Sequence, residues 1–254
     1  MDRKIDLINR EGEAIEEAVA WHTAGIVAED GQSIGTGSAV LWRQHPLILT
    51  ARHVIAGSPD DDIWLYFRHE GTMKRSRIDD LPNQRDVKYK TKVRVNIIGR
   101  RCSEHVDLAA LEVQRSIEDE HPIRFFELVE GPVTPPSGTV ITMRGYPSDL
   151  ARVVAPGSAA AIAMLQWSRI HDKPPFAPFD LATEFLTPFV AANLGKHARG
   201  FSGAGAWFDK PTGGVWHPNL GLAGVCTHYY PRRKLLSLLR IEQVGRFLGE
   251  AFPG

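Results

Sequence analysis

The chain has 254 residues, of which 43% are hydrophobic and 24% charged, proportions of an ordinary soluble globular protein. Thirty basic and thirty acidic residues give a formal net charge of zero, which excludes a global field that recruits nucleic acid or an anionic membrane. Two cysteines, Cys102 and Cys226, are too few for a disulfide framework, and reduced thiols fit this count better than the alternative, one bridge between them.

The first twenty residues predict an amphipathic helix over residues 3–20. Ile5, Ile8, Ile15 and Val19 recur at helical spacings among charged residues. We expect this helix to pack against the β structure that follows, with docking of a partner as the alternative. The charged start of the chain lacks the apolar core of a secretory signal, and no apolar run reaches the roughly 18 residues of a membrane span. These features predict a cytoplasmic protein with no membrane partner.

The rest of the chain predicts short strands separated by turn-forming residues. The strands are expected at residues 22–28, 37–42, 47–50, 63–67, 87–98, 108–113, 139–144, 151–155, 159–167, 183–189, 206–208, 221–227 and 235–239. Gly31, Gly35 and Gly37 predict turns, and a helix is expected over 241–251. The basic residues that alternate along 87–98 have too few aromatic neighbours for nucleic-acid binding, so they predict a solvated strand face.

A span rich in glycine and proline, residues 131–138, predicts the boundary between two halves. The expected organisation is an N-terminal helix over 1–20, a first β domain over 21–130 and a second over 131–254. Each half is long enough to bury a core.

The segment from Arg199 to Trp207 places Ser202 between Gly200 and Gly203. Glycine permits a sharp turn and lets a substrate carbonyl approach the main chain. Successive backbone N–H groups in such a turn can point at one spot, where a developing oxyanion would sit. A serine hydroxyl needs a base and a group that orients the base. His53 and Asp107, which each lie beside a predicted strand, supply both groups.

In this chain order, His53, Asp107 and Ser202 resemble the chymotrypsin-like (trypsin-like) serine peptidases. Further segments carry the resemblance: 35–41, 47–54, 106–111, 200–203 and 222–228. The resemblance implies an all-β fold of two six-stranded antiparallel barrels, with the terminal helix expected here. It also implies a serine endopeptidase without cofactor or metal, acting on a protein or peptide substrate through an acyl-enzyme intermediate.

The resemblance assigns a role to each residue of this constellation. Ser202 is the nucleophile, His53 the general base and acid, and Asp107 the residue that holds the imidazole. The backbone N–H groups of Gly200 and Ser202 form the oxyanion hole. Because His53 and Asp107 come from the first half and Ser202 from the second, we expect the site between the halves.

Two departures from the family pattern bear on control and selectivity. Phe201 stands where secreted digestive members carry an aspartate that pairs with a newly cut N-terminus, so the site is either constitutively formed or controlled by a regulatory protein partner. By resemblance, Lys196 lies near the base of the specificity pocket. The expected substrate-binding residues are Lys196, His197, Thr227 and His228. A cationic pocket wall at Lys196, with His228 on the facing strand, predicts selectivity for an acidic residue before the cut. In the alternative, Lys196 and Arg199 are solvated loop charges.

Two other classes of protein fit the serine turn less well. An α/β-hydrolase esterase would need glycine two residues after the serine, where this chain has Ala204, and a histidine later in the chain. A catalytically silent peptidase fold that binds peptides or acts as a scaffold would not need all three side chains, which are present here. Metal hydrolysis lacks support, because the histidines are scattered with no zinc-binding motif.

Overall fold

The computed structural model describes residues 2–28, 34–58, 63–67, 96–148, 151–155, 158–161, 163–171, 180–190, 197–212 and 216–253. Its helices are α1 (Asp2–Trp21), α2 (Arg52–Ile55), α3 (Ile117–Glu120) and α4 (Ile241–Ala251). In this part of the chain, no helix has both the length and the hydropathy of a membrane-spanning segment.

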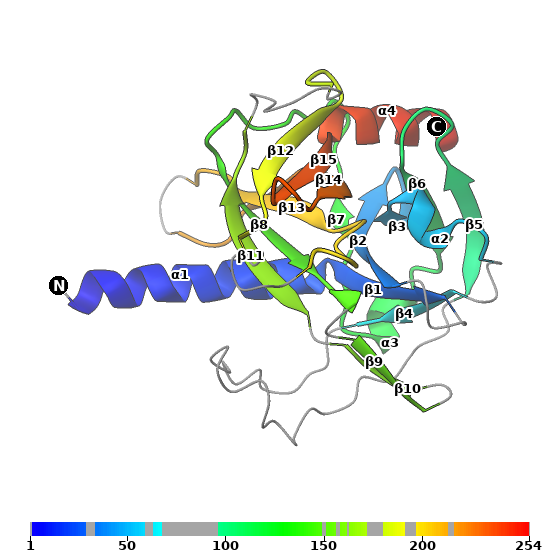
Figure 1. Ribbon diagram of the computed structural model, residues 1–254, viewed down its shortest axis with the longest axis horizontal. Coiled ribbons are helices and arrows are strands. Elements are labelled where there is room, and N and C mark those ends of the chain that lie inside the picture. Colours follow the sequence, from blue (N-terminus) through cyan, green and yellow to red (C-terminus); the bar gives the residue numbers. More distant parts are fainter. Residues whose placement is uncertain are drawn as a thin grey trace.

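The first sheet comes from the N-terminal half and is antiparallel along the order β4-β1-β2-β3-β6-β5. A short seventh strand, β7, pairs in parallel with β2. The strands are β1 (Thr23–Ala28), β2 (Ile34–Trp42), β3 (His45–Thr50), β4 (Ile63–Tyr66), β5 (Ile97–Cys102), β6 (Ala109–Val113) and β7 (Phe126–Glu127). Figure 1 shows this sheet beside the second one.

The second sheet has six strands in the order β11-β8-β13-β14-β15-β12. They are β8 (Val140–Gly145), β11 (Met164–Arg169), β12 (Glu184–Pro188), β13 (Gly205–Asp209), β14 (Leu220–Tyr230) and β15 (Leu235–Arg240). A separate two-stranded hairpin consists of β9 (Ala151–Ala155) and β10 (Ser158–Ala161). The two antiparallel half-barrels, with a helix at each end of the chain, confirm the predicted fold class.

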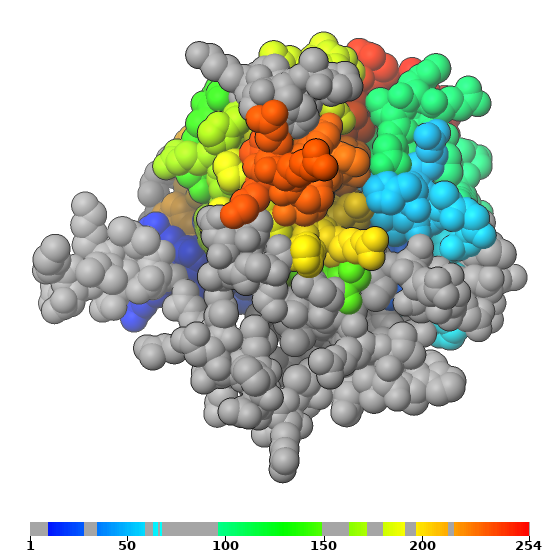
Figure 2. All heavy atoms as spheres, viewed as in Figure 1, coloured from blue at the N-terminus to red at the C-terminus, as the bar shows by residue number. Residues whose placement is uncertain are grey.

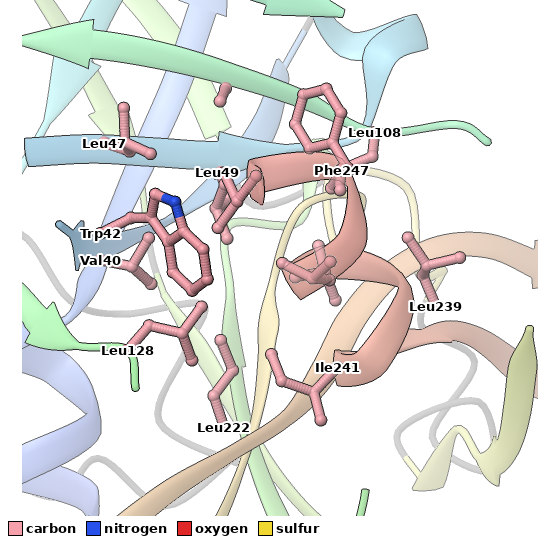
Figure 3. Packing of buried hydrophobic residues seen from close by; sticks show 14 of the residues in the cluster. Val40, Trp42, Leu47, Leu49, Leu108, Leu128, Leu222, Leu239, Ile241 and Phe247 are labelled. Carbon is pink, nitrogen blue, oxygen red and sulfur yellow. The ribbon is translucent and has the colours of Figure 1, made fainter. Parts of the chain in front are cut away.

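Three clusters of buried side chains hold the sheets together. One fills the first half-barrel, with Ile26 and Ile48 among its members, and another fills the second, with Phe185 and Phe201. The third joins the sheets: Figure 3 shows side chains of β2 and β3 packed against Leu222 of β14 and the α4 residues. Burial of this shared cluster fixes the two sheets relative to each other, and with them the ends of β3 and β13.

Both terminal helices contribute to the shared cluster. Ile15 and Val19 of α1 are buried in it, which supports the predicted packing role for the second half of that helix. Figure 1 shows the first half of α1 extending beyond the sheets. At the other end, Glu242 of α4 accepts hydrogen bonds from the backbone N–H and the hydroxyl of Thr134, at 2.8 and 2.6 Å. These bonds tie the segment between the two sheets to the C-terminal helix.

Several turn and strand predictions differ from the structure, and the two-residue strand β7 was not predicted. Gly35 and Gly37 lie within β2 and not in turns, and a Cβ at Gly37 would meet Ile48 of the neighbouring strand. Glycine is therefore required there by close packing. The predicted strand 159–167 is divided between β10 and β11. For the predicted strand 87–98, residues 87–95 lie outside the described residues, and β5 begins at Ile97.

Candidate active site

His53 lies in the first turn of α2, which follows directly on the end of β3. Val54 and Ile55 of the same short helix are buried in the core of the first sheet, whereas the His53 side chain is 52% exposed. The apolar neighbours therefore anchor the turn and leave the imidazole at the surface.

Asp107 lies in the tight loop before β6. The Ser103 hydroxyl accepts hydrogen bonds from the backbone N–H groups of His105 and Val106, both at 3.2 Å, and Leu108 is fully buried. The bonds to Ser103 and the burial of Leu108 hold the loop on either side of Asp107. The Asp107 carboxylate accepts two hydrogen bonds from His53. The backbone N–H donates to Oδ1 at 3.0 Å, and the ring Nδ1–H donates to Oδ2 at 2.6 Å.

Opposing effects act on the Asp107 carboxyl. Burial raises its pKa, but the hydrogen bonds from the His53 side chain and backbone lower it, as do the charges of His53 and Arg52. The net result is a pKa below the ordinary value of 3.8. Asp107 is therefore ionised at neutral pH and holds the proton of the His53 ring on Nδ1, so that Nε2 is free to accept.

Ser202 lies in the turn before β13, and its Oγ donates to Nε2 of His53 at 3.0 Å. The hydrogen bonds thus form a continuous chain from the hydroxyl through the imidazole to the carboxylate. In such an arrangement the imidazole can remove the hydroxyl proton as the oxygen attacks, and the carboxylate stabilises the resulting cation. Figure 2 shows the surface near residue 200, in yellow, bordering the cyan surface of the residues just after position 50.

Two backbone N–H groups of this turn have no acceptor within the described part of the chain, namely those of Gly200 and Ser202. The other N–H groups of the turn are occupied. Phe201 donates to Ala198 O at 2.9 Å, and Gly203 donates to Cys226 O at 2.7 Å. Free donors beside a serine hydroxyl can bind an oxyanion, and the oxyanion hole at Gly200 and Ser202 stays a prediction.

The turn depends on glycine at two positions with left-handed backbone. Gly200 has φ +93° and Gly203 has φ +92°. A Cβ at Gly200 would overlap the carbonyl oxygen of Tyr146, and one at Gly203 would overlap the carbonyl oxygen of Thr36. Both positions therefore need glycine for the backbone angle and for the close approach of another segment.

Residues of β2 and β3 that the sequence analysis did not single out seat this turn on the first sheet. Thr36 donates from its backbone N–H to Ser202 O at 2.8 Å and from its hydroxyl to Gly200 O at 2.6 Å. The Ser38 hydroxyl donates to Gly203 O at 3.0 Å. The hydroxyl of Thr50 in turn donates to Thr36 O at 2.8 Å. Gly35 and Gly37, which alternate with Thr36 and Ser38 in the sequence, do not signal this contact, because a Cβ at either would meet Val54 or Ile48 of the first half of the chain.

The predicted substrate-binding residues lie in three different environments. Lys196 lies outside the described residues, and His197 is exposed. Thr227 is buried in β14, and its hydroxyl has no partner among the described residues. His228 is exposed on the same strand, with its ring edge-on to Tyr230 at 4.6 Å. The contact of Gly203 with Cys226 places β14 beside the serine turn, but the substrate-binding role of these four residues stays a prediction.

The Cys226 thiol, on the strand beside the serine turn, does not add a second nucleophile. Burial raises the pKa of the Cys226 thiol to about 12, so it is protonated at neutral pH. Cys102 is exposed, and neither cysteine forms a disulfide. Within the described ranges, no group of three or more His, Cys, Asp or Glu side chains could hold a metal ion.

Solved structures with the same fold match nearly the whole chain. The scabies mite inactivated protease paralogue S-D1 has a TM-score of 0.59 at 13% identity, over 93% of this chain and 94% of that one. The scabies mite inactivated protease paralogue S-I1 has a TM-score of 0.58 at 15% identity, over 93% of this chain and 96% of that one. The inactive form of a serine-to-alanine mutant of Rv3671c from M. tuberculosis has a TM-score of 0.50 at 15% identity, over 94% of this chain and 92% of that one. At such identities the likeness shows the chymotrypsin-like fold alone.

Sequence comparison adds the family. No curated protein matches the chain. The family model of the trypsin-like peptidase domain matches residues 35–185, a span that includes His53 and Asp107 and ends before Ser202. This match extends over more than half of the 254 residues. The chain therefore belongs to the family of trypsin-like peptidase domains.

Proposed function

We propose that this chain is a serine endopeptidase that hydrolyses peptide bonds at Ser202. The observation that carries the proposal is the unbroken hydrogen-bond chain from Ser202 through His53 to Asp107, beside the free N–H groups of Gly200 and Ser202. A nucleophile, a base, an orienting carboxylate and an oxyanion site are the four parts that acyl transfer requires.

Acylation follows from these positions. Ser202 Oγ attacks the substrate carbonyl carbon while its proton passes to Nε2 of His53, and the N–H groups of Gly200 and Ser202 receive the oxyanion. When the tetrahedral intermediate collapses, the C–N bond breaks and His53 gives the proton to the leaving amine. An ester to Ser202 remains. Water then attacks this ester with His53 again taking the proton, the acid product leaves, and Ser202 regains its hydrogen.

We propose that the active site forms without an ion pair at position 201, the residue just before the nucleophile. Phe201 is fully buried, and its ring meets that of Phe189 edge-on at 5.5 Å. Apolar packing therefore anchors the residue before the nucleophile, where an aspartate would need a charged partner. Because the free N–H groups and the hydrogen-bond chain coexist in the single chain, we favour a constitutively formed site over one that a regulatory partner completes.

Selectivity for an acidic residue before the cut is a finer part of the proposal. His197 and His228 are exposed near the serine turn, and either could pair with a substrate carboxylate. Profiling of cleavage sites in a peptide library tests the preference. A majority of cuts after basic or large apolar residues would contradict it.

Hydrolysis itself is tested with the same library and an unfolded protein such as casein, using the wild-type chain and Ser202→Ala. The wild type should release new amino termini, and Ser202→Ala should release none above background. No release by a folded wild-type chain would favour the alternative, a catalytically silent member of the fold that binds peptides. Two of the similar structures are inactivated paralogues by name, which makes this control necessary.

A further inference from the structure

We propose that Thr36, a residue of the first sheet, is a positioning residue for the oxyanion hole: its hydroxyl holds the peptide unit that lies between the two free N–H groups. The inference rests on the proposed function and assigns to it a residue outside the Ser202–His53–Asp107 set. It follows from the contacts made by the backbone carbonyls of the serine turn.

Each N–H group of the hole belongs to a peptide unit whose carbonyl is held from the opposite side. The N–H of Gly200 shares a unit with the carbonyl of Arg199, which accepts from Ser148 N–H at 2.8 Å. The N–H of Ser202 shares one with the carbonyl of Phe201, which accepts from Ala204 N–H at 2.9 Å. In a trans peptide unit the C=O and N–H bonds point in opposite directions, so a held carbonyl fixes the direction of the N–H.

The peptide unit between these two is held from both sides, because its N–H, that of Phe201, donates to Ala198 O at 2.9 Å. Its carbonyl, that of Gly200, accepts from the Thr36 hydroxyl at 2.6 Å, and among the described residues no other donor reaches this oxygen. Gly200 is buried, so water does not easily replace a lost donor. A glycine at φ +93° has no Cβ to restrict rotation of this unit, and such rotation would tilt both N–H groups of the hole.

The direction of the Thr36 hydroxyl is itself determined. Its oxygen accepts a hydrogen bond from Tyr146 N–H at 3.0 Å, so its one hydrogen is directed to Gly200 O. The backbone of Thr36 is held too, because its N–H donates to Ser202 O and its carbonyl accepts from Thr50 Oγ1. Thr36 is 0% exposed, so bulk water does not compete for the hydrogen bond between its hydroxyl and Gly200 O.

The test measures the rate at which a fluorophosphonate reacts with Ser202. In this reaction Ser202 Oγ attacks phosphorus, fluoride leaves, the hydroxyl proton passes to His53, and the phosphoryl oxygen develops charge where the hole would bind it. The variants are Thr36→Val, which keeps the shape and removes the donor, and Thr36→Ser, which keeps the hydroxyl. Thr23→Val is the matched control, because it removes the hydroxyl of another buried threonine, which donates to Val19 O at 2.8 Å and makes no bond to the serine turn within the described residues.

We expect Thr36→Val to react about 10- to 100-fold more slowly than the wild type, less than the effect of losing a hole donor outright. The rates of Thr36→Ser and Thr23→Val should stay within about threefold of the wild-type rate. The apparent pKa in the pH–rate profile should be the same in wild type and Thr36→Val, because the His53–Asp107 pair is untouched. A general loss of structure on removal of a buried threonine hydroxyl would instead slow Thr23→Val as well, and thermal melting of each variant monitors it.

The outcomes separate the inference from the function. If the folded wild type does not react, the proposed function fails and the inference fails with it. If the wild type reacts and Thr36→Val reacts equally fast, only the inference is overturned. It is also overturned if Thr36→Ser is as slow as Thr36→Val. Thr36→Ala removes the same hydroxyl without the added methyl group and takes the place of Thr36→Val if the latter does not fold.

Discussion

Replacing Gly203 by alanine should destabilise the protein as well as abolish activity, because the serine turn is seated directly on strand β2. The new Cβ would overlap the Thr36 carbonyl oxygen and lie 2.5 Å from the Thr50 hydroxyl, where 3.4 Å is an ordinary contact. Neither neighbour is the free end of a flexible side chain. The turn and β2 must therefore move apart.

The cost can be worked out from the contacts that are lost. Alanine at φ +92° costs about 1–2 kcal/mol in backbone strain. Separation breaks three bonds, from Thr36 N–H to Ser202 O, from the Thr36 hydroxyl to Gly200 O and from the Ser38 hydroxyl to Gly203 O, each worth about 1 kcal/mol net. We expect Gly203→Ala to lower the free energy of unfolding by about 4–5 kcal/mol, measured by urea denaturation.

Gly138→Ala is the matched control for this measurement. Gly138 has φ +87°, and a Cβ there would meet nothing within 4 Å, so the substitution costs the backbone strain of about 1–2 kcal/mol alone. If Gly203→Ala and Gly138→Ala lower the free energy of unfolding equally, the serine turn does not pack directly against Thr36 and the reasoning is refuted.

Three further predictions concern the site and the packing around it. Asp107→Asn should lower kcat by about 10⁴-fold, since an amide facing Nδ1 puts the ring proton on Nε2. The lowered pKa of Asp107 means that its ionised form stabilises the fold above pH 3.8 and loses this effect as the pH falls below it, so the Tm values of wild type and Asp107→Asn should converge in acid. Glu242→Ala should cost about 1–3 kcal/mol by urea denaturation, because it leaves the N–H of the buried Thr134 without its acceptor. Iodoacetamide at pH 8 should modify exposed Cys102 and spare Cys226, as mass spectrometry of the folded protein would show.

Local patterns in the sequence predicted most of the elements. The alternation and turn signals located β1, β3, β12 and β15 to within two residues at each end, and the terminal helix matched α4. His53, Asp107 and Ser202 could be singled out because each carries a distinct chemistry next to a strand. Such residues can be recognised in a single sequence, because the chemistry of their own side chains identifies them and no knowledge of their contacts is needed.

Features that depend on contacts between distant segments could not be predicted. Thr36 lies 164 residues from Gly200, and a threonine between glycines is typical of a turn when read alone. The parallel pairing of Phe126–Glu127 with β2 has no local signal in two residues. The short helix α2 follows a strand without a capping side chain, so nothing in the sequence marks its start.

The most direct measurement of the central claim is the mass of the residue that a fluorophosphonate modifies. With the wild-type chain at neutral pH, the phosphonyl group should be found on Ser202 after proteolytic digestion. Ser202→Ala should stay unmodified, and His53→Ala should react far more slowly while still folded. A folded wild-type chain that stays unmodified, or carries the group on another residue, would contradict the activation of Ser202 by His53.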